Sequence, residues 1–274
     1  MKPWAAPGVF LAAACLALAP QPGRAEPPEQ PRVIEGIEVG KPGGELRMLI
    51  GRERETRFFN TYGYSHLIGF DRDLNLVPDI LESYEVEDGR IFTLHLRKGH
   101  KWSDGQPFSA DDVMFTWNDI VLDPNVVKAA SKRSTWQIDG KDIDLEKVDD
   151  YTIKWTFPVE KPAYKLFDMN ELVWSVAPAH ILKPFHPKYT PSSDYQKFQD
   201  ALPPNALPVV TMGPWVPVEY KTDELMVFRR NPYYWKVDES GKQLPYLNEV
   251  IFEKAATGVI RSSHRPCAAG SSPA

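Results

Sequence analysis

The sequence predicts a mixed α and β protein in which strands and helices alternate without an internal repeat. Three observations support this fold class. The segment from Ile91 to Leu96 alternates apolar and polar residues, as a half-buried strand does. The segment after Ser109 instead repeats its apolar residues at helical spacing. The 274 residues, 42% of them hydrophobic, are enough for a real core in one large domain or two smaller ones.

The first 25 residues (1–25) resemble a signal peptide for export. Met1 and Lys2 give a short positive start, and the apolar run that follows is too short for a comfortable membrane span. Ala25 completes a small-residue pattern typical of cleavage before Glu26. Lipoprotein anchoring at Cys15 is the alternative, which we favour less because the apolar run continues past this cysteine. We therefore expect an exported protein, periplasmic or extracellular.

Composition narrows the function classes. The net charge of −5 and the pI near 5.7 provide no electrostatic footprint for nucleic acid. After signal cleavage Cys267 stands alone, so we expect no internal disulfide and no cysteine metal site. We find no phosphate-binding loop and no zinc motif, and expect neither a cofactor nor a metal. The 8 Trp and 11 Tyr residues suit a core together with a binding cleft.

The N-terminal third predicts few regular elements. Residues 26–42 are rich in Pro, Glu and Gly and are expected to form a flexible lead-in. A strand is predicted over 45–50. The aromatic and polar stretch 58–70 is interrupted by Asn and Gly, and 71–75 is expected to form a loop. A short helix is predicted over 79–84, directly after a proline.

The next stretch predicts a strand, a turn and a helix in succession. The strand covers 91–96, and the Ser-Asp-Gly sequence at 103–105 predicts a turn. Ser109 is expected to cap the helix, with Asp112 completing a capping box. Asp111 and Asp112 then complement the positive helix start and need not be a catalytic pair. The core-facing stripe of this helix is Val113, Trp117 and Ile120.

The remaining elements follow the same mixed pattern. The clearest strand covers 151–157, where aromatic and apolar residues alternate with Thr and Lys. A short helix is predicted over 177–182, with a proline in its first turn. Residues 203–208 form a proline-rich, hinge-like segment, and another strand is predicted over 224–228.

One fragment resembles the nucleophile elbow of serine hydrolases. Residues 63–67 match the G-x-S-x-G pattern up to the last position, where Leu67 replaces glycine. No clean apolar strand precedes the fragment and no good helix follows it. A secreted serine hydrolase using Ser65 is therefore an alternative that we weigh against a binding function.

Two further fragments suggest metal sites and are better explained otherwise. The acidic run 71–75 resembles the start of a calcium loop, but Leu76 stands where that loop needs glycine and Pro78 lies inside it. A solvated loop is the favoured interpretation. His95 and His100 have no acid or cysteine at metal-ligand spacing beside them. We expect both histidines to lie on the surface.

The stretch from the strand at 91–96 into the helix after Ser109 carries a motif formed by Leu96, Arg97, Lys98, Trp102, Asp104, Gly105, Pro107, Ala110, Asp112 and Val113. Further motifs are NLVP with LESY at 75–84, VDDYTI at 148–153, RNPYYW at 230–235 and LPYL at 244–247. In this order they resemble the signature and the accompanying motifs of the family 5 extracellular solute-binding proteins, which include oligopeptide, dipeptide and nickel binding proteins of ABC importers. The resemblance covers about residues 43–253.

The resemblance implies an α/β fold of the periplasmic-binding-protein type (type II, cluster C), whose lobes close about a hinge. The first lobe would be discontinuous, formed by 43–75 and 203–253, with 76–202 as an inserted subdomain. The signature would be a structural corner of that subdomain. The tail 254–274 shifts to Ala, Ser, Gly, Arg and Pro, and we expect it to be disordered. We also expect the second lobe to be missing, as in a truncated form that binds weakly or not at all.

The resemblance also implies a function without catalysis. The protein would be the substrate-binding component of an ABC importer, a monomer that captures peptides or a similar small solute and delivers them to permease subunits in the membrane. The residues expected near the ligand are Tyr62, Gly63, Tyr64, Ser65, Gly213 and Trp215. Ser65 replaces an acid that is common in peptide binders, so nickel complexes, sugars and opines are alternative ligands.

Overall fold

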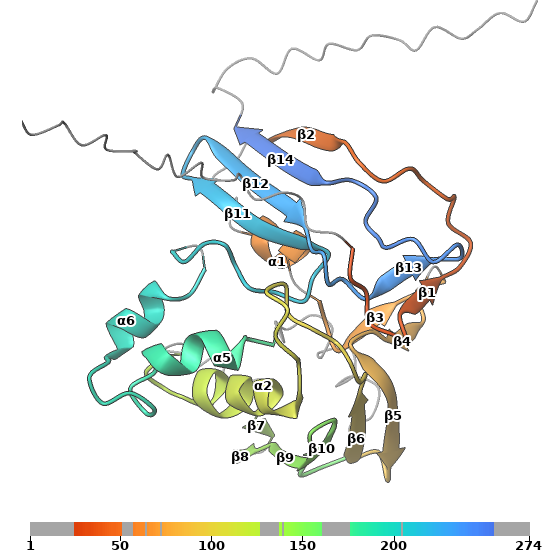
Figure 1. Cartoon of the computed structure of the whole chain (residues 1–274). Coiled ribbons are helices and arrows are strands. Elements are labelled where there is room, and N and C mark those ends of the chain that lie inside the picture. The colour runs from red at the N-terminus through yellow and green to blue at the C-terminus, as the bar shows by residue number, and fades with distance from the viewer. Residues whose placement is uncertain are drawn as a thin grey trace, which may run out of the picture.

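The computed structural model describes residues 25–50, 57–63, 65–71, 73–126, 137–138, 140–160, 176–203 and 205–254. The predictions for the signal peptide, for Cys15, for Cys267 and for nearly all of the tail therefore lie outside the described residues. Two four-stranded sheets dominate the described part of the chain, and they lie toward opposite ends of the molecule (Figure 1).

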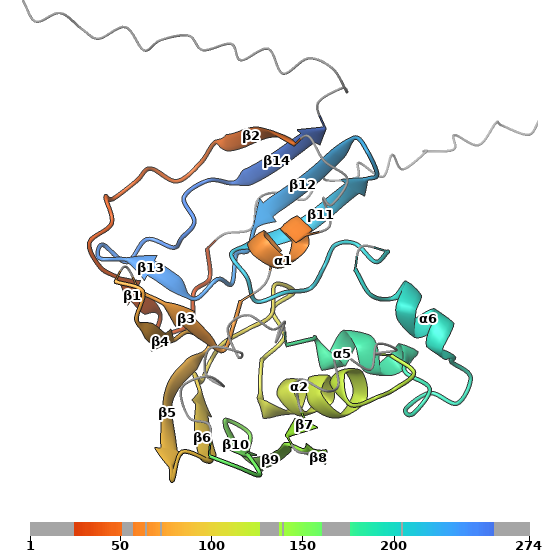
Figure 2. The same ribbon diagram turned by 180° about the vertical axis from the view of Figure 1, so that it is seen from behind.

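The first of these, called here the upper sheet, joins segments far apart in the sequence. Its strands, in spatial order, are β11 (Trp215–Lys221), β12 (Leu225–Arg230), β14 (Glu249–Lys254) and β2 (Glu45–Ile50). β2 runs parallel to β14, and the other neighbours are antiparallel. Helix α1 (Arg57–Gly63) lies on the face of this sheet that is turned toward the helices at the other end of the molecule (Figure 2).

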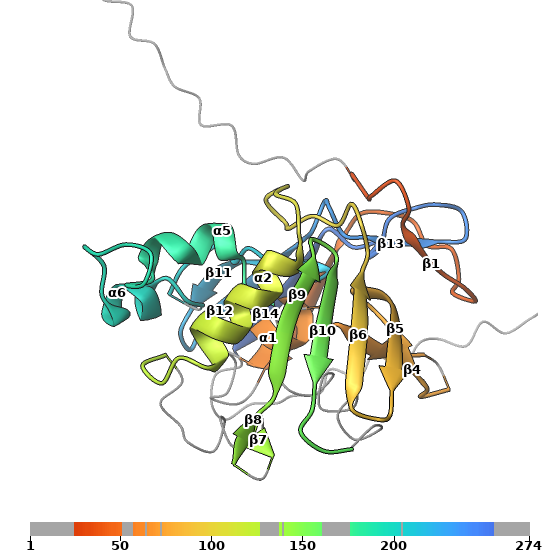
Figure 3. The ribbon, with the colours of Figure 1, turned by 90° about the horizontal axis from the view of Figure 1, so that it is seen from below.

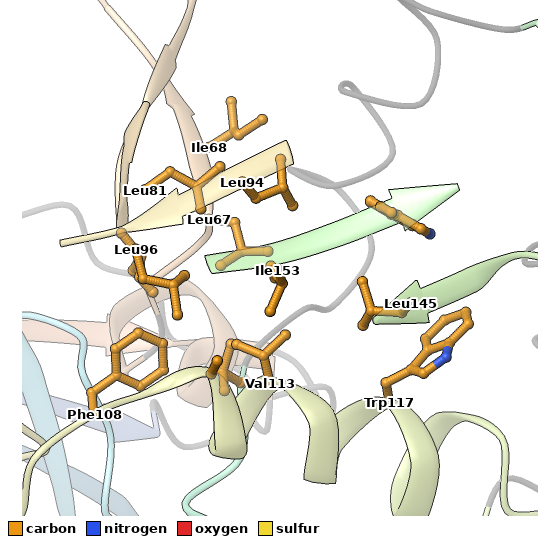
Figure 4. Close-up of a cluster of buried hydrophobic side chains, with 14 of the residues drawn as sticks. Leu67, Ile68, Leu81, Leu94, Leu96, Phe108, Val113, Trp117, Leu145 and Ile153 are labelled. Carbon is orange, nitrogen blue, oxygen red and sulfur yellow. The ribbon is translucent and has the colours of Figure 1, made fainter. Parts of the chain in front are cut away.

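The second, called the lower sheet, is antiparallel throughout. Its strands, in spatial order, are β5 (Leu81–Glu87), β6 (Ile91–Leu96), β10 (Thr152–Thr156) and β9 (Asp144–Asp149). Helix α2 (Ala110–Phe115), continued by a π-helical turn over Thr116–Val121, covers one face of the sheet (Figure 3). Apolar side chains from the sheet and the helix interdigitate between them (Figure 4).

Short elements complete the described fold. Three two-stranded pairings are β1 (Arg32–Ile34) with β13 (Lys236–Asp238), β3 (Ile68–Phe70) with β4 (Leu76–Pro78), and β7 (Gln137–Ile138) with β8 (Lys141–Asp142). The remaining helical segments are α5 (Ala179–Leu182), a 3-10 turn over Lys183–Phe185, and α6 (Tyr195–Asp200).

Most elements predicted from the sequence are confirmed. The strands at 45–50 and 91–96 appear with the predicted bounds, and those at 151–157 and 224–228 shift by one or two residues. The capping box of α2 is present, with Asp112 as its acidic member. Helix α1 was not predicted, because seven residues with little apolar periodicity are ordered mainly by packing on the upper sheet.

The helix predicted over 79–84 is wrong. The chain there forms the edge strand β5, which pairs with β6 from Leu81 opposite Leu96 to Glu87 opposite Ile91. Leu81 is fully buried at the start of this strand, and the pairing register with β6 shifts between Leu81 and Ser83. Pairing with a strong neighbouring strand overrides the local preference of this short segment.

Residues 26–42, expected to be a flexible lead-in, contain β1 and a buried ionic contact. Asp79 is 8% exposed and lies 3.0 Å from Arg32 Nη1 and 2.6 Å from Lys236 Nζ. The Arg32 guanidinium also donates to the carbonyl of Pro78 at 2.7 Å. These charge-assisted contacts hold the N-terminal arm against the body of the protein.

His100, predicted to lie on the surface, is buried with 1% of its area exposed. Its ring stacks on Trp235 with centroids 4.9 Å apart, and neither ring nitrogen bonds to any described residue. Burial lowers the pKa of His100 to about 3, and the charges of Arg97 and Lys236 add to the effect. Trp235 lies more than 130 positions from His100 in the chain, so the sequence around His100 could not predict that its ring is buried.

The acidic pair at the start of α2 divides into a buried and an exposed member. Asp112 is 5% exposed and accepts hydrogen bonds from the backbone of Ser109 (3.1 Å) and Ala179 (3.0 Å) and from Trp102 Nε1 (3.3 Å). Asp111 is exposed and pairs with Lys147 at 2.8 Å. Asp112 therefore connects the signature turn, α2 and α5. Asp111 contributes only an exposed ion pair at the surface.

Replacing Asp112 by alanine should destabilise the protein far more than replacing Asp111. Asp112→Ala leaves three donors without their acceptor, two of them in the buried interior, and should lower the free energy of unfolding by about 3 kcal/mol or more. Asp111→Ala removes an exposed ion pair and should cost less than about 1 kcal/mol. Urea unfolding of both variants checks this, and because both lose a helix-start charge, equal losses would contradict the assigned role of Asp112.

Acid should destabilise the protein through His100. Between pH 6.5 and about 3 the unfolded chain carries a proton on this ring that the folded chain excludes. The free energy of unfolding should therefore fall as the pH falls through this window, by up to about 1.4 kcal/mol per pH unit for the one proton. His100→Phe keeps the ring on Trp235 and should flatten this dependence, as measured by urea unfolding at pH 7.5, 5.5 and 4.5.

The half-exposed His95 provides the matched control for that series. His95→Gln removes a histidine whose ring stays in contact with water on the outer face of the lower sheet. The loss of stability with acid should change less in this variant than in His100→Phe, because His95 keeps its contact with water and His100 does not. A His100→Phe variant that loses stability with acid as steeply as the wild type would show that His100 does not carry the effect.

Candidate functional site

The candidate site is built where three separate segments of the chain meet. They are the end of α1 with the residues after it, the signature turn at 103–105, and residues 211–215, called here the 211–215 segment. The residues predicted to lie near a ligand fall in the first and third of these. Their meeting is a result of the tertiary fold, since about 150 positions separate them.

The hydroxyl of Thr211 joins two of these segments. Thr211 is fully buried, and its Oγ1 donates a hydrogen bond to the carbonyl of Gly63. The same oxygen accepts the backbone N–H of Gly213 at 3.1 Å. A second link runs in parallel, because Ser65 Oγ donates to the carbonyl of Met212 at 3.1 Å. Two hydroxyls thus hold the predicted residues Gly63, Ser65 and Gly213 together.

Gly63 allows the close approach of α1 to β11. A Cβ placed on this residue would lie 3.3 Å from Pro217 Cγ and 3.6 Å from the carbonyl oxygen of Trp215. Any larger side chain would push α1 away from the strand. The predicted residues Gly63 and Trp215 are therefore in direct proximity.

The opposite side of the 211–215 segment is held by Asn231, which is fully buried. Its Nδ2 donates to the carbonyl of Gly213 at 2.9 Å, and its backbone N–H donates to the carbonyl of Pro214 at 3.0 Å. Its Oδ1 accepts the N–H of Tyr233 at 2.9 Å. Sequence reasoning used Asn231 only as part of a family motif and missed this role, although an asparagine placed before a proline between two apolar strands was a signal for it.

The aromatic residues of the predicted site belong to the core of the upper sheet. Trp215 begins β11 and is 7% exposed. The half-buried ring of Tyr62 lies 5.2 Å from Phe252 and 6.0 Å from Phe228, measured between centroids. Tyr64 lies outside the described residues. The backbone and the hydroxyls around the 211–215 segment, more than these rings, form the polar part of the site.

Ser65 is not arranged as a nucleophile. It is 7% exposed, and its Oγ donates to a backbone carbonyl, which cannot take a proton as a general base would. The neighbouring His66 is partly buried, and burial lowers its pKa. The hydrolase alternative therefore finds no support in this geometry.

Among the residues that the structure describes, the groups that hydrogen-bond to the 211–215 segment are neutral: they are peptide groups, the hydroxyls of Ser65 and Ser103, and the amide of Asn231. The signature turn also carries a carboxylate, Asp104, which pairs with His180 at 2.8 Å. In the described residues no three side chains of the His, Cys, Asp or Glu type are grouped to hold a metal ion. The buried groups around the segment are bonded to one another, so they fix the geometry of the segment.

Two hollows of the surface lie apart from this junction. One is an apolar cavity of about 90 Å³ between α5, the end of α6 and the proline-rich stretch before Val210. The other is an open polar groove on the lower sheet, lined by residues such as Glu85, His95 and Lys98. Neither is lined by the 211–215 segment or by Ser65, so both are distinct from the candidate site. The helices of the described ranges are all too short or too polar to cross a bilayer.

Comparison with known proteins matches this arrangement to a family. The model for bacterial extracellular solute-binding proteins, family 5 (its middle region), matches residues 75–259. The periplasmic alpha-galactoside-binding protein of Rhizobium meliloti is 46% identical over 182 residues, which is 66% of this chain and 26% of that protein.

Solved structures agree in fold. The periplasmic binding protein MelB of Agrobacterium fabrum, in complex with stachyose, superposes with a TM-score of 0.66 at 39% identity, over 79% of this chain and 35% of MelB. An oligopeptide-binding protein OppA superposes with a TM-score of 0.69 at 32% identity, over 83% of this chain and 38% of OppA. The chain spans between 26% and 38% of the length of these three proteins. It belongs to the family 5 bacterial extracellular solute-binding proteins and has the α/β fold of periplasmic binding proteins.

Proposed function

We propose that this protein is the substrate-binding component of an ABC importer and that the described residues contribute one wall of its solute cleft. The membership in family 5 supports this function, as does the likeness to two binding proteins of known structure. The 211–215 segment, with Gly63 and Ser65 beside it, is the proposed wall. The partners would be a small solute and the permease subunits of a membrane transporter, in the cell envelope.

The proposed solute is an α-galactoside oligosaccharide. The observation that carries this choice is the 46% identity to the alpha-galactoside-binding protein of Rhizobium meliloti. The complex of MelB with stachyose, at 39% identity, supports the same ligand class. The sequence alone placed peptides first and sugars among the alternatives, and we propose the reverse order on the support of these two relatives.

The chemistry of the junction is consistent with a sugar. An oligosaccharide carries many hydroxyls and no charge, and neutral fixed donors and acceptors recognise it without an ionic partner. A peptide instead brings an ammonium group, for which a carboxylate is the strong acceptor. Ser65 stands where peptide binders commonly have that acid. Its hydroxyl already donates a hydrogen bond to the backbone carbonyl of Met212.

A peptide is the second candidate, because one observation favours it. The OppA structure, an oligopeptide-binding protein, has a TM-score of 0.69 to this chain and 32% identity. Peptide main chains can also be held by backbone hydrogen bonds alone, as an added strand would be. The two candidates differ in what they require of the site, and a binding experiment separates them.

Stachyose should bind the chain weakly but saturably, because the described residues supply one wall of the proposed cleft, and tri-alanine should not bind. Titration of the purified protein with each compound, followed by intrinsic tryptophan fluorescence and by amide chemical shifts, measures this. The amides around Trp215 and Gly213 should be among those that shift. Maltotetraose, a tetrasaccharide like stachyose but without galactose, is the matched control and should bind more weakly.

The outcome decides between the candidates. Saturable binding of tri-alanine with no response to stachyose would overturn the sugar proposal in favour of peptides. Equal binding of stachyose and maltotetraose would retain a sugar but reject the α-galactoside class. No response to any of the three compounds would contradict the proposed binding function.

A further inference from the structure

We infer that Ser103, in the turn of the family signature, is a positioning residue for the solute site and acts through Thr211. The inference rests on the proposed function in one respect, namely that the 211–215 segment faces the solute. The sequence assigns the signature turn a purely structural role. The structure instead shows the turn bonded directly to the segment that holds Gly213.

The contact between Ser103 and Thr211 is reciprocal. The backbone N–H of Ser103 donates to the carbonyl of Thr211 at 2.9 Å, and the backbone N–H of Thr211 donates to Ser103 Oγ at 3.1 Å. The serine hydroxyl thus replaces a backbone carbonyl in what would otherwise be a two-stranded ladder. Both hydrogen-bonding groups of the Thr211 backbone are directed at this one residue.

Thr211 passes the constraint on to the site. Its side-chain oxygen bonds to the carbonyl of Gly63 and to the N–H of Gly213. A continuous series of hydrogen bonds therefore leads from Ser103 Oγ, through the backbone and then the hydroxyl of Thr211, to the Gly213 amide. A shift of the Thr211 backbone would displace Gly63 and Gly213 together.

The turn that carries Ser103 is itself rigid. The N–H of Gly105 donates to the carbonyl of Trp102 at 2.9 Å, and the N–H of Gln106 donates to Asp104 Oδ1 at 3.1 Å. Trp102 is 1% exposed and is bonded through its indole N–H to Asp112 of α2. Ser103 thus extends from a fixed corner, as a residue that supports a binding geometry should.

The segment keeps other supports when this hydroxyl is lost. Asn231 still holds the carbonyls of Gly213 and Pro214, and Ser65 still holds that of Met212. Removing the Ser103 hydroxyl should therefore loosen the position of Thr211 and Gly213 without unfolding the protein. This separates a positioning residue from one that only stabilises the fold.

The test compares Ser103→Ala with Ser103→Thr and with Ser83→Ala in the full chain. Ser83 is an exposed serine of the lower sheet and controls for the loss of a hydroxyl as such. Hydrogen exchange of the Gly213 amide, two residues from the lost bond, reports the position of the segment without any ligand. In Ser103→Ala this exchange should rise about tenfold, the effect of one lost hydrogen bond. The melting temperature should fall by about 2–4 °C relative to Ser83→Ala, because the buried N–H of Thr211 loses its acceptor, while the unfolding transition stays cooperative.

Affinity for stachyose provides the second measurement. It should fall about tenfold in Ser103→Ala, remain unchanged in Ser83→Ala, and be restored in Ser103→Thr, which keeps the acceptor oxygen. Suppose that neither the wild type nor any variant binds stachyose, while exchange of the Gly213 amide still rises in Ser103→Ala. The proposed sugar function then fails, and the positioning role of Ser103 stands. If the Gly213 amide of Ser103→Ala exchanges as slowly as that of the wild type, the inference is overturned. A loss of folding in this variant would also overturn it.

Discussion

The buried hydroxyl of Thr211 is the interaction on which the arrangement of the candidate site depends. It bonds to the end of α1 and to Gly213, while its backbone bonds to the signature turn. A buried hydroxyl that lacked these partners would carry a substantial desolvation cost, so the three segments must meet in one geometry for the hydrogen bonds to form. This single residue thus links the signature turn, beside the lower sheet, to α1, which packs on the upper sheet.

The chemistry around Thr211 also bears on the hydrolase alternative. In the described residues, the hydroxyls of Ser65 and Thr211 and the amide of Asn231 have protein partners, and Ser65 donates to a backbone carbonyl, which is no general base. These bonded groups fix the geometry of the 211–215 segment, as the supporting residues of a binding site do.

The errors of sequence interpretation share a physical cause. The segment 79–84 appeared helical because its local composition is ambiguous, and only the pairing of Leu81 with Leu96 makes it a strand. His100 was expected on the surface because no acid or cysteine stands beside it at metal-ligand spacing, and in the fold its ring is buried against the distant Trp235. In both cases a contact distant in sequence outweighed the local preference. The strands with strict alternation, such as 91–96, needed no such contact to be recognised.

The sequence by itself determined the fold class, the strong strands, the cap of α2 and the family, because these depend on local periodicity and on short motifs. By resemblance it also predicted that Gly63, Ser65, Gly213 and Trp215 lie near a ligand, and the structure brings these residues close together. Only the tertiary structure decided that Thr211, Ser103 and Asn231 hold this site together. The reason is that hydrogen bonds between residues 18 to 148 positions apart leave no periodic trace in the chain and exist only once the segments have packed.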